Sequence, residues 1–265
     1  MRSPDGLPPD RDGASQAKLV ELQRRVEELT SAVAARDTFI AVASHELRNP
    51  MTPMIGHIEL VLNGVRSGRY SLRQVEERLE RVRMVMNQYL KRAATLLDVS
   101  RITTGKLRLE PSPVDLCVVT REIVEAFAAA ARHASAPITV DAPESLLGTW
   151  DRLAIEQIID NLVSNAIKYG NHQPIDIVIE CVNDTVSIRV QDRGPGISVE
   201  NRTRIFERFE RAVGSNEPRS GFGVGLWVVG QLVDAMGGTI SVADAQGGGS
   251  VFTVILPRHV HVTCV

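Results

Sequence analysis

The chain has 265 residues and a formal net charge of −2 at pH 7, and 43% of its residues are hydrophobic. This composition supports folded cores, and the nearly balanced charge excludes binding to nucleic acid or to an anionic membrane surface through a strong overall field. Because no run of about 18 apolar residues occurs and the three cysteines lack metal or redox spacing, we expect no membrane insertion and a cytoplasmic location.

The N-terminal part is predicted to be helical and to pair with other helices. Residues 1–15 are polar and rich in proline and glycine, which predicts a disordered leader. Apolar residues then recur every seven positions, and this repeat predicts a coiled-coil signalling helix over residues 16–36 that needs a partner helix. The seam continues beyond this helix, and its positions are Leu19, Val26, Val33, Ile40, Leu47, Met54 and Val61.

A helical hairpin is predicted over residues 37–104. Residues 64–71 contain glycine and polar residues that predict a turn, and an apolar stripe from Val75 to Leu97 predicts a second helix. Two antiparallel helices alone would leave these stripes exposed to water. We therefore expect a homodimer in which two hairpins form a four-helix bundle.

The rest of the chain predicts an α+β domain over residues 114–258, after a linker at 105–113 and before a tail at 259–265. The sequence has no strand–helix alternation suited to a Rossmann fold. We expect a two-layer α/β sandwich with helices on one face of an antiparallel or mixed sheet. The periodicity predicts helices at 116–134, 152–168 and 227–236 and strands at 138–140, 147–150, 175–181, 185–191, 239–243 and 250–256.

His45 is the first candidate catalytic residue. If the apolar seam faces a partner helix, His45 lies on the outer face, where a nucleophile can meet a phosphate donor. Glu46 could take the proton from one imidazole nitrogen while the other attacks, and Asn49 lies one helical turn further on the same side. For residues 45–50 alone, the alternative is a surface histidine on a structural helix that is loosened at Pro50.

A second group of candidates lies on the predicted helix 152–168. Asn161, Asn165 and Lys168 follow one another at spacings of four and three, so they share one helix face. Two amide oxygens and an ammonium group suit a Mg²⁺ ion that bridges phosphates. The alternative is a polar face exposed to solvent, which the apolar residues of the same helix argue against. A Walker-type phosphate loop is absent from the sequence.

Asp192 ends a predicted strand and opens a turn that contains Gly194 and Gly196. A carboxylate at this position could accept a hydrogen bond from the exocyclic amine of adenine, and the glycines would let the backbone approach the base. A simple turn is the alternative for this string in isolation.

The last candidates precede the third predicted helix. Gly221, Gly223 and Gly225 could present backbone amides to a phosphate at the helix N-terminus, although a flexible loop is the alternative. Between this loop and the Asp192 turn, Arg208 and Arg211 lie in a segment with the composition of a lid, in which arginines can bind phosphate.

Taken in order, these strings resemble the H, N, G1, F and G2 boxes of the sensor histidine kinases of two-component signalling, over roughly residues 30–257. The resemblance implies a dimeric phosphotransfer hairpin followed by an ATP-binding domain of the Bergerat type. It implies a protein-histidine kinase that uses ATP and Mg²⁺ to phosphorylate its own His45, with Glu46 as the base. The phosphoryl group then passes to an aspartate of a response-regulator receiver domain, and Asn49 matches a position that supports phosphatase action in related kinases.

The resemblance also implies roles within the nucleotide site. Asn165, assisted by Asn161, matches the magnesium ligand, and Asp192 matches the adenine contact. The other implied nucleotide-binding residues are Lys168, Tyr169, Gly194, Gly196, Arg208, Arg211, Gly221, Gly223, Gly225 and Leu226.

The chain departs from the family pattern at Trp227, where a small residue is common. No sensor or receiver domain is recognisable, so either an upstream partner delivers the signal to the coil, or the chain is a cytosolic kinase or a fragment of a longer one. Another ATPase with the same kind of pocket and a non-catalytic dimeric adaptor are the rival interpretations. The histidine hairpin argues against the first, and the intact Asn165 and Asp192 argue against the second. The stimulus, the cognate regulator and the choice between phosphorylation within or across the dimer stay open.

Overall fold

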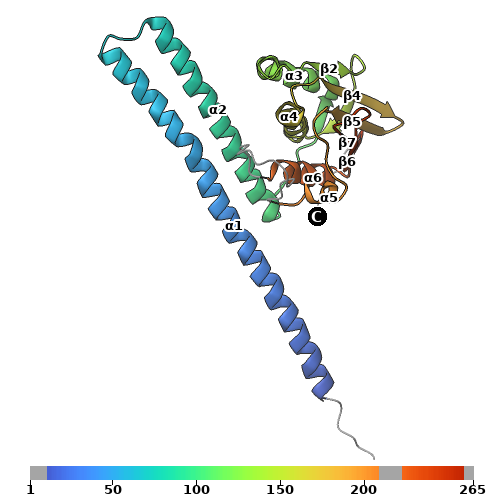
Figure 1. Cartoon of the computed structure of the whole chain (residues 1–265). Helices are drawn as coiled ribbons and strands as arrows, with labels where there is room; N and C mark the ends of the chain where they lie inside the picture. Colours follow the sequence, from blue (N-terminus) through green and yellow to red (C-terminus); the bar gives the residue numbers. More distant parts are fainter. Residues whose placement is uncertain (1–10, 209–222, 260–265) are drawn as a thin grey trace, which may run out of the picture. The chain divides into compact units, whose positions relative to one another are not determined.

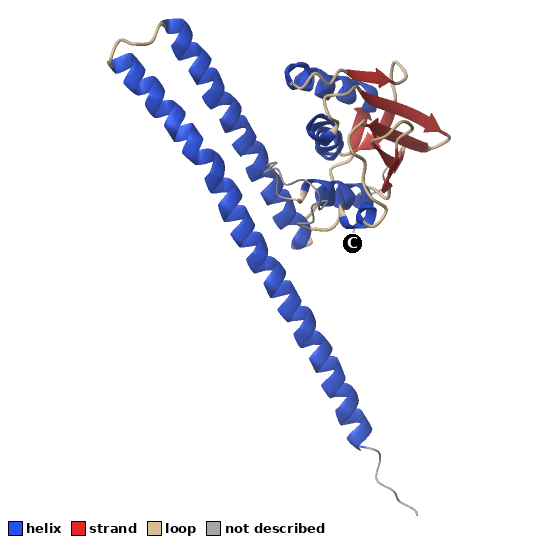
Figure 2. Ribbon diagram, in the orientation of Figure 1, coloured by secondary structure: helices blue, strands red, loops and turns tan. Residues whose placement is uncertain are grey.

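The computed structural model describes residues 11–208 and 223–259 (Figure 1). The chain divides into two compact units, residues 1–89 and residues 90–265. The first unit is helical, and the second combines helices with β-sheet (Figure 2). This confirms the predicted α+β fold class.

Two long helices build the first unit: α1 (Arg11–Arg66) and the larger part of α2 (Leu72–Thr103). α1 is one continuous element, so the predicted coiled coil and the first arm of the predicted hairpin belong to the same helix. It begins at Arg11, inside the segment predicted as a disordered leader, because each residue added to an existing helix gains a hydrogen bond without a new nucleation cost. The helix also continues through Pro50, where the sequence predicts a looser backbone.

The turn between α1 and α2 forms where the sequence predicts it. A Cβ atom added at Gly64 would lie 2.0 Å from Cδ2 of Tyr70, so the absent side chain lets the Tyr70 ring cover the end of α1. The guanidinium of Arg78 stacks on the same ring, with Cζ 4.6 Å from the ring centroid. Ser71 and Gln74 form a capping box, in which the Ser71 N–H donates to Gln74 Oε1 over 3.0 Å and the Gln74 N–H donates to Ser71 Oγ over 3.4 Å.

The first unit leaves apolar side chains uncovered along α1. Leu19, Val26 and Val33 are 57%, 61% and 48% exposed, although they occupy predicted seam positions. Such a stripe normally packs against another helix. Across residues 11–208 and 223–259, no helix combines the length and apolar character needed to cross a bilayer.

The second unit contains a five-stranded sheet with the order β2-β4-β5-β7-β6. β2 pairs with β4 in parallel, and the other neighbouring strands are antiparallel, so the sheet is mixed as predicted. A separate two-stranded sheet joins β1 to β3. The strands are β1 (Ser112–Asp115), β2 (Ile138–Asp141), β3 (Leu147–Trp150), β4 (Ile175–Val182), β5 (Thr185–Gln191), β6 (Thr239–Asp244) and β7 (Ser250–Pro257), and the helices are α3 (Leu116–His133), α4 (Arg152–Tyr169), α5 (Asn201–Arg204) and α6 (Gly225–Ala235).

One face of the large sheet is buried against α3, α4 and α6 (Figures 1 and 2). Buried and partly exposed residues alternate along β4, β5 and β7, which is the period-2 pattern of strands covered on one face. The core strands contribute Ile175, Ile177, Ile179, Val186, Ile188, Val190, Phe252, Val254 and Leu256. The sheet is therefore fixed by its apolar face, and its strand ends are available to carry function.

Aspartate side chains cap two helices of this unit. Asp115 Oδ1 accepts from the N–H groups of Cys117 and Val118 at the start of α3, over 3.0 and 3.3 Å. The Ser145 hydroxyl donates to Asp115 Oδ2 over 2.5 Å, and this hydrogen bond lowers the pKa of the carboxyl group. Asp151 begins α4 in the same way by accepting from the Ala154 N–H over 3.0 Å. These caps set where each helix begins, so Asp151 fixes the position of the helix that carries the candidate Asn161 and Asn165.

Three elements differ from the sequence prediction. Residues 112 and 113 form part of β1 rather than the predicted linker, because Pro113 is tolerated in a strand that pairs on only one side. α6 begins at Gly225, two residues earlier than predicted, and this places a glycine in its first turn. The short helix α5 is an additional element that the periodicity does not show.

The end of β7 is tied to β3. The Trp150 indole is fully buried, and its Nε1–H donates to the Pro257 carbonyl over 2.8 Å. The Thr149 N–H donates to the Arg258 carbonyl over 2.9 Å, and Arg258 Nε donates to the Leu147 carbonyl over 2.7 Å. The two sheets are thereby joined through the residues that follow β7.

Candidate nucleotide site

α4 carries the first part of the candidate site. Asn161, Asn165 and Lys168 all lie on this helix, at the spacings of four and three residues that predict a shared face, and all three are half-buried. The Asn161 amide donates from Nδ2 to the Gln157 carbonyl over 2.9 Å, so its Oδ1 is the atom that remains as an acceptor. Lys168 Nζ lies 4.8 Å from the centroid of the Tyr169 ring, so these two candidates contact each other at the C-terminal end of α4.

Asp192 follows β5 directly and is buried, with only 6% of the residue exposed. Its Oδ1 accepts from the Gly194 N–H over 2.8 Å and from the Ser250 N–H over 3.3 Å. Burial raises the pKa of this carboxyl group, and the two backbone hydrogen bonds oppose that shift. Its Oδ2 makes no hydrogen bond within the described part of the chain, and it is not among the fully buried unpaired atoms there. One acceptor of a buried carboxylate is therefore available to a ligand.

Glycines bring the Asp192 turn against its neighbours. A Cβ at Gly194 would lie 2.2 Å from the Tyr169 carbonyl oxygen, so the turn packs on the C-terminal end of α4. A Cβ at Gly249 would lie 2.1 Å from the Asp192 carbonyl oxygen, so the β6–β7 turn packs on the other side. Gly196 has a φ of +76°, a conformation that favours glycine. Because the backbone segments approach so closely, positions 194 and 249 have no room for a side chain beside Asp192.

The N-terminus of α6 completes the part of the site that the structure describes. A Cβ at Gly225 would lie 2.6 Å from Asn161 Oδ1, so the first turn of α6 packs against the polar face of α4. Gly223 has a φ of +64° just before this helix, and Leu226 is half-buried in its first turn. No side chain caps α6 at Val224. Its first backbone N–H groups therefore point toward the same region as Asn161 and can bind an anion.

Arg208 reaches this region from the segment after α5. Its Cζ lies 4.8 Å from the centroid of the Trp227 ring, which belongs to the first turn of α6. The structure thus brings together candidates from α4, the Asp192 turn, the Arg208 segment and α6. Sequence reasoning missed Trp227 as part of this group, it gave Gly249 no role in the site, and it placed Ser250 only at the start of a predicted strand.

Arg193 is another residue that the sequence analysis missed. It follows Asp192, and its guanidinium donates to the Pro174 carbonyl over 2.5 Å and to Asp176 Oδ2 over 2.6 Å. The Thr139 hydroxyl donates to the other oxygen of Asp176 over 2.6 Å. This network fastens the Asp192 turn to the start of β4 and to β2. The position of an arginine between Asp192 and Gly194 could have drawn attention to this residue. Its partner Asp176 lies 17 residues away in the sequence, so the ion pair could not be predicted from the local motif.

The remaining candidates have no described environment. His45, Glu46 and Asn49 lie in α1, and their side chains fall outside the described part of the structure. Arg211 and Gly221 also lie outside the described residues.

The described residues fit a bound ATP molecule. Asp192 offers an open acceptor beside backbone that glycines make accessible, which suits an adenine amine. The N-terminus of α6 and the two cations Lys168 and Arg208 suit phosphates. Asn161 and Asn165 supply amide oxygens, which are suitable Mg²⁺ ligands when phosphates and water complete the shell.

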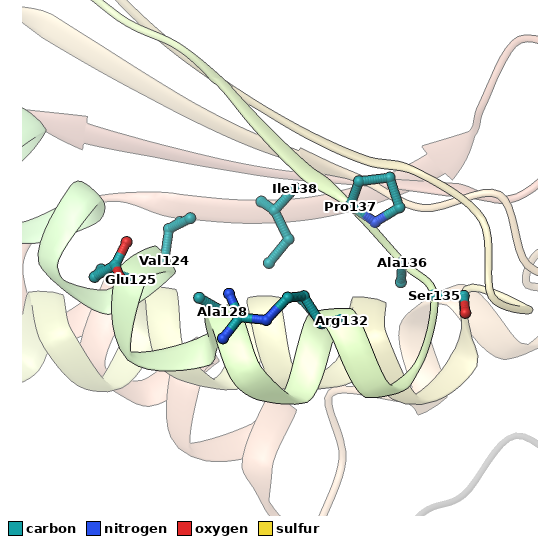
Figure 3. A pocket seen from close by; sticks show the side chains of 9 residues that line it. Val124, Glu125, Ala128, Arg132, Ser135, Ala136, Pro137 and Ile138 are labelled. Atoms are coloured by element: carbon teal, nitrogen blue, oxygen red, sulfur yellow. The ribbon is translucent and has the colours of Figure 1, made fainter.

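A cavity of about 380 Å³ lies elsewhere, between α3 and the start of β2. Figure 3 shows Val124, Ala128 and Arg132 of α3 facing Ile138 of β2 across it. None of the candidate nucleotide-binding residues lines this cavity.

Comparisons with known proteins agree with this geometry. Residues 150–260 match the family of histidine kinase-, DNA gyrase B- and HSP90-like ATPases, and residues 35–105 match the His Kinase A (phospho-acceptor) domain. The second match contains His45, and the first contains the whole described nucleotide site. The chain belongs to the sensor histidine kinases of two-component signalling.

Individual histidine kinases resemble the chain over most of its length. The sensor histidine kinase TmoS of Ectopseudomonas mendocina is 34% identical over 243 residues, which cover 89% of this chain and 24% of TmoS. The sensor histidine kinase RcsC of Salmonella typhimurium is 32% identical over 259 residues, which cover 94% of this chain and 26% of RcsC. The structure of the Acinetobacter baumannii histidine kinase AdeS superposes with a TM-score of 0.59 at 27% identity and covers 81% of this chain and 98% of that one. The chain spans about a quarter of the length of the curated histidine kinases that it matches.

Proposed function

We propose that the chain is an ATP-dependent protein-histidine kinase that phosphorylates His45 and passes the phosphoryl group to an aspartate of a response regulator. The observation that carries this proposal is the assembled nucleotide site around Asp192, in the same chain as a phospho-acceptor domain match that contains His45. A pocket of this kind without such a histidine would support only an ATPase.

We propose that Asp192 selects adenine. Its Oδ1 is already committed to two backbone N–H groups, so Oδ2 is the atom that accepts from the exocyclic amine of the base. Gly194 and Gly196 keep the neighbouring backbone free of side chains. We assign Tyr169, whose carbonyl oxygen the turn approaches at Gly194, and Leu226 in the first turn of α6 to the same site by their motif positions.

In this proposal the phosphates lie between α4 and the N-terminus of α6. Lys168 and Arg208 contribute positive charge, and Gly223 and Gly225 let the backbone approach. Asn165, with Asn161, holds a Mg²⁺ ion, which supplies charge neutralisation to the phosphates when it is bound. We place Arg211 and Gly221 in the same binding site by their motif positions.

His45 is the proposed nucleophile. One imidazole nitrogen forms a bond to the γ-phosphorus of ATP, the bond from that phosphorus to the bridging oxygen breaks, and ADP leaves. Glu46 takes the proton from the other imidazole nitrogen. A carboxylate oxygen of the regulator then bonds to the phosphorus of the phosphohistidine as the nitrogen–phosphorus bond breaks, and the proton held by Glu46 returns to the ring, which restores the neutral imidazole.

We further propose that the chain acts as a homodimer. The exposed apolar residues of α1, Val26 and Leu29 among them, would be covered by a second copy, and the hairpins would pair as a four-helix bundle. The proposed organisation is a signalling helix over 16–36, a phosphotransfer hairpin over 37–104 and a catalytic domain over 114–258. A sensor input reaches the signalling helix from another domain or another protein.

The proposal is tested with the full chain, radiolabelled ATP and Mg²⁺. We expect a phosphate that is lost in acid and kept in base, because a phosphoramidate hydrolyses once its nitrogen is protonated. His45→Ala should abolish the label and keep ATP binding, while the control His133→Ala, which changes an exposed histidine at the end of α3, should keep both. Undiminished label in His45→Ala would refute the assignment.

A further inference from the structure

Trp227 packs in the apolar core around α6 and also presents the face of its indole ring to Arg208. The side chain lies in the first turn of α6 and is 9% exposed, and the neighbouring Val228 and Val229 are fully buried. The Arg208 guanidinium stacks on the indole, with Cζ 4.8 Å from the ring centroid. An aliphatic residue could fill the same apolar space, but it could not attract a guanidinium through a π face.

The stack lies at the end of α6 that meets the nucleotide site. Gly225, two residues before Trp227, packs against Asn161 Oδ1 on the polar face of α4. Trp227 and Gly225 belong to the same helical turn, so the stacked guanidinium is held at the N-terminus of α6. The free backbone N–H groups of this turn are the proposed phosphate donors.

Stacking leaves the arginine ready to bind an anion. A guanidinium placed over an aromatic face meets the ring on one side only, so N–H donors on its other sides stay available to an anion. Arg208 makes no ion pair with any residue in the ranges 11–208 and 223–259, so its charge is not neutralised by a described carboxylate. The flexible side chain is thus restricted before the ligand arrives, which lowers the entropy lost on binding.

We infer that Trp227 is a positioning residue for Arg208 and that it acts on the phosphate part of the nucleotide. This inference rests on the proposed ATP-binding function and adds a residue to it. Trp227 touches the guanidinium rather than the nucleotide, so its effect should depend on Arg208 and should be absent for a ligand without phosphates.

A double-mutant cycle on the full chain tests this. Binding of ATP with Mg²⁺ and binding of adenosine are measured by calorimetry for the wild type, Trp227→Leu, Arg208→Ala and the double variant. Trp227→Leu should weaken ATP binding roughly 2- to 30-fold, the range expected for a cation–π contact, and should leave adenosine binding unchanged. In the Arg208→Ala background the same change should have no further effect.

Two results would overturn the inference while the proposed function stands. One is an equal loss of ATP and adenosine binding in Trp227→Leu, since that pattern indicates only a structural role in α6. The other is a loss of the same size with and without Arg208. Trp227→Phe retains an aromatic face and should recover most of the ATP affinity, so a phenylalanine variant as weak as the leucine variant would also count against it. A wild-type protein that does not bind ATP would instead overturn the proposed function itself.

Discussion

Replacing Asp192 with asparagine should change which base the site prefers. Oδ1 accepts from the N–H groups of Gly194 and Ser250, so an asparagine must keep its carbonyl oxygen in that position to avoid leaving both donors unpaired. Its NH₂ group then takes the place of Oδ2. The position that accepts from the adenine amine becomes a donor, and a donor suits the O6 carbonyl of guanine.

The magnitude follows from the hydrogen bond that is lost. A buried polar group left without its partner costs about 1–3 kcal/mol, or roughly 5- to 150-fold in affinity at 1.4 kcal/mol per decade. We therefore expect ATP binding to Asp192→Asn to weaken by about this factor, while the preference for ATP over GTP narrows or reverses. Titrations of the full chain with both nucleotides measure the two affinities, and Asp141→Asn, at the exposed end of β2, controls for the loss of one charge.

Stability should change in the opposite direction from binding. Burial raises the pKa of Asp192 above its unfolded value of about 3.9, so folding disfavours the ionised form. The wild type then loses stability as pH rises from the unfolded pKa to the folded pKa, and the variant does not. Relative to the wild type, Asp192→Asn should be more stable near pH 7 than at about pH 4.

Urea unfolding followed by tryptophan emission reports this difference, because Trp150 and Trp227 are the chain's two tryptophans and both lie in the second unit. An unchanged preference for ATP over GTP would refute the assigned role of Oδ2. A stability difference that is the same at both pH values would refute the proposed cost of burying the carboxylate.

Three further changes test other parts of the site. Gly249→Ala places a Cβ 2.1 Å from the Asp192 carbonyl oxygen, so it should destabilise the second unit and weaken ATP binding. The control Gly247→Ala, at φ +90° with no atom near the new Cβ, should cost only about 1–2 kcal/mol of backbone strain. Equal losses of stability in urea unfolding would contradict the packing argument. Arg193→Gln removes a partly exposed ion pair and should weaken ATP binding only about 2- to 5-fold, with partial recovery in Arg193→Lys. A calorimetric titration that shows no loss of ATP affinity would mean that the Arg193 network does not position the Asp192 turn. Asn49→Ala should keep phosphorylation of the chain and slow dephosphorylation of its regulator, because an amide can orient a water but cannot serve as a base; paired rate measurements in which both activities fall together would make this residue structural.

The sequence predicts the elements whose side chains follow a strong period. The alternation in β5 and β7 and the apolar face of α4 identify these elements within one or two residues. β1 could not be found in this way, because it has four residues, contains Pro113 and gains its stability from pairing with β3. The early start of α1 depends on extension of a long helix, which residue composition does not reveal.

The candidate site follows the same rule. Asp192, Asn161 and the glycines could be chosen from short motifs, because each motif is local in the sequence. The contacts that hold the site together could not be chosen, since they join distant segments. Ser250 donates to Asp192 across 58 positions, and Trp227 meets Arg208 only because α6 and the segment after α5 are adjacent in space.

The link between β3 and the residues after β7 has a practical consequence for fragment design. A catalytic fragment that ends before Arg258 would remove the carbonyl that pairs with Thr149, and one that ends before Pro257 would also leave the buried Trp150 indole N–H without an acceptor. A start after Glu110 would likewise remove the N–H that donates to the Asp151 side chain over 2.8 Å. Soluble expression for crystallography or NMR should therefore favour boundaries outside residues 110–259, and affinity tags should be joined beyond them through a spacer.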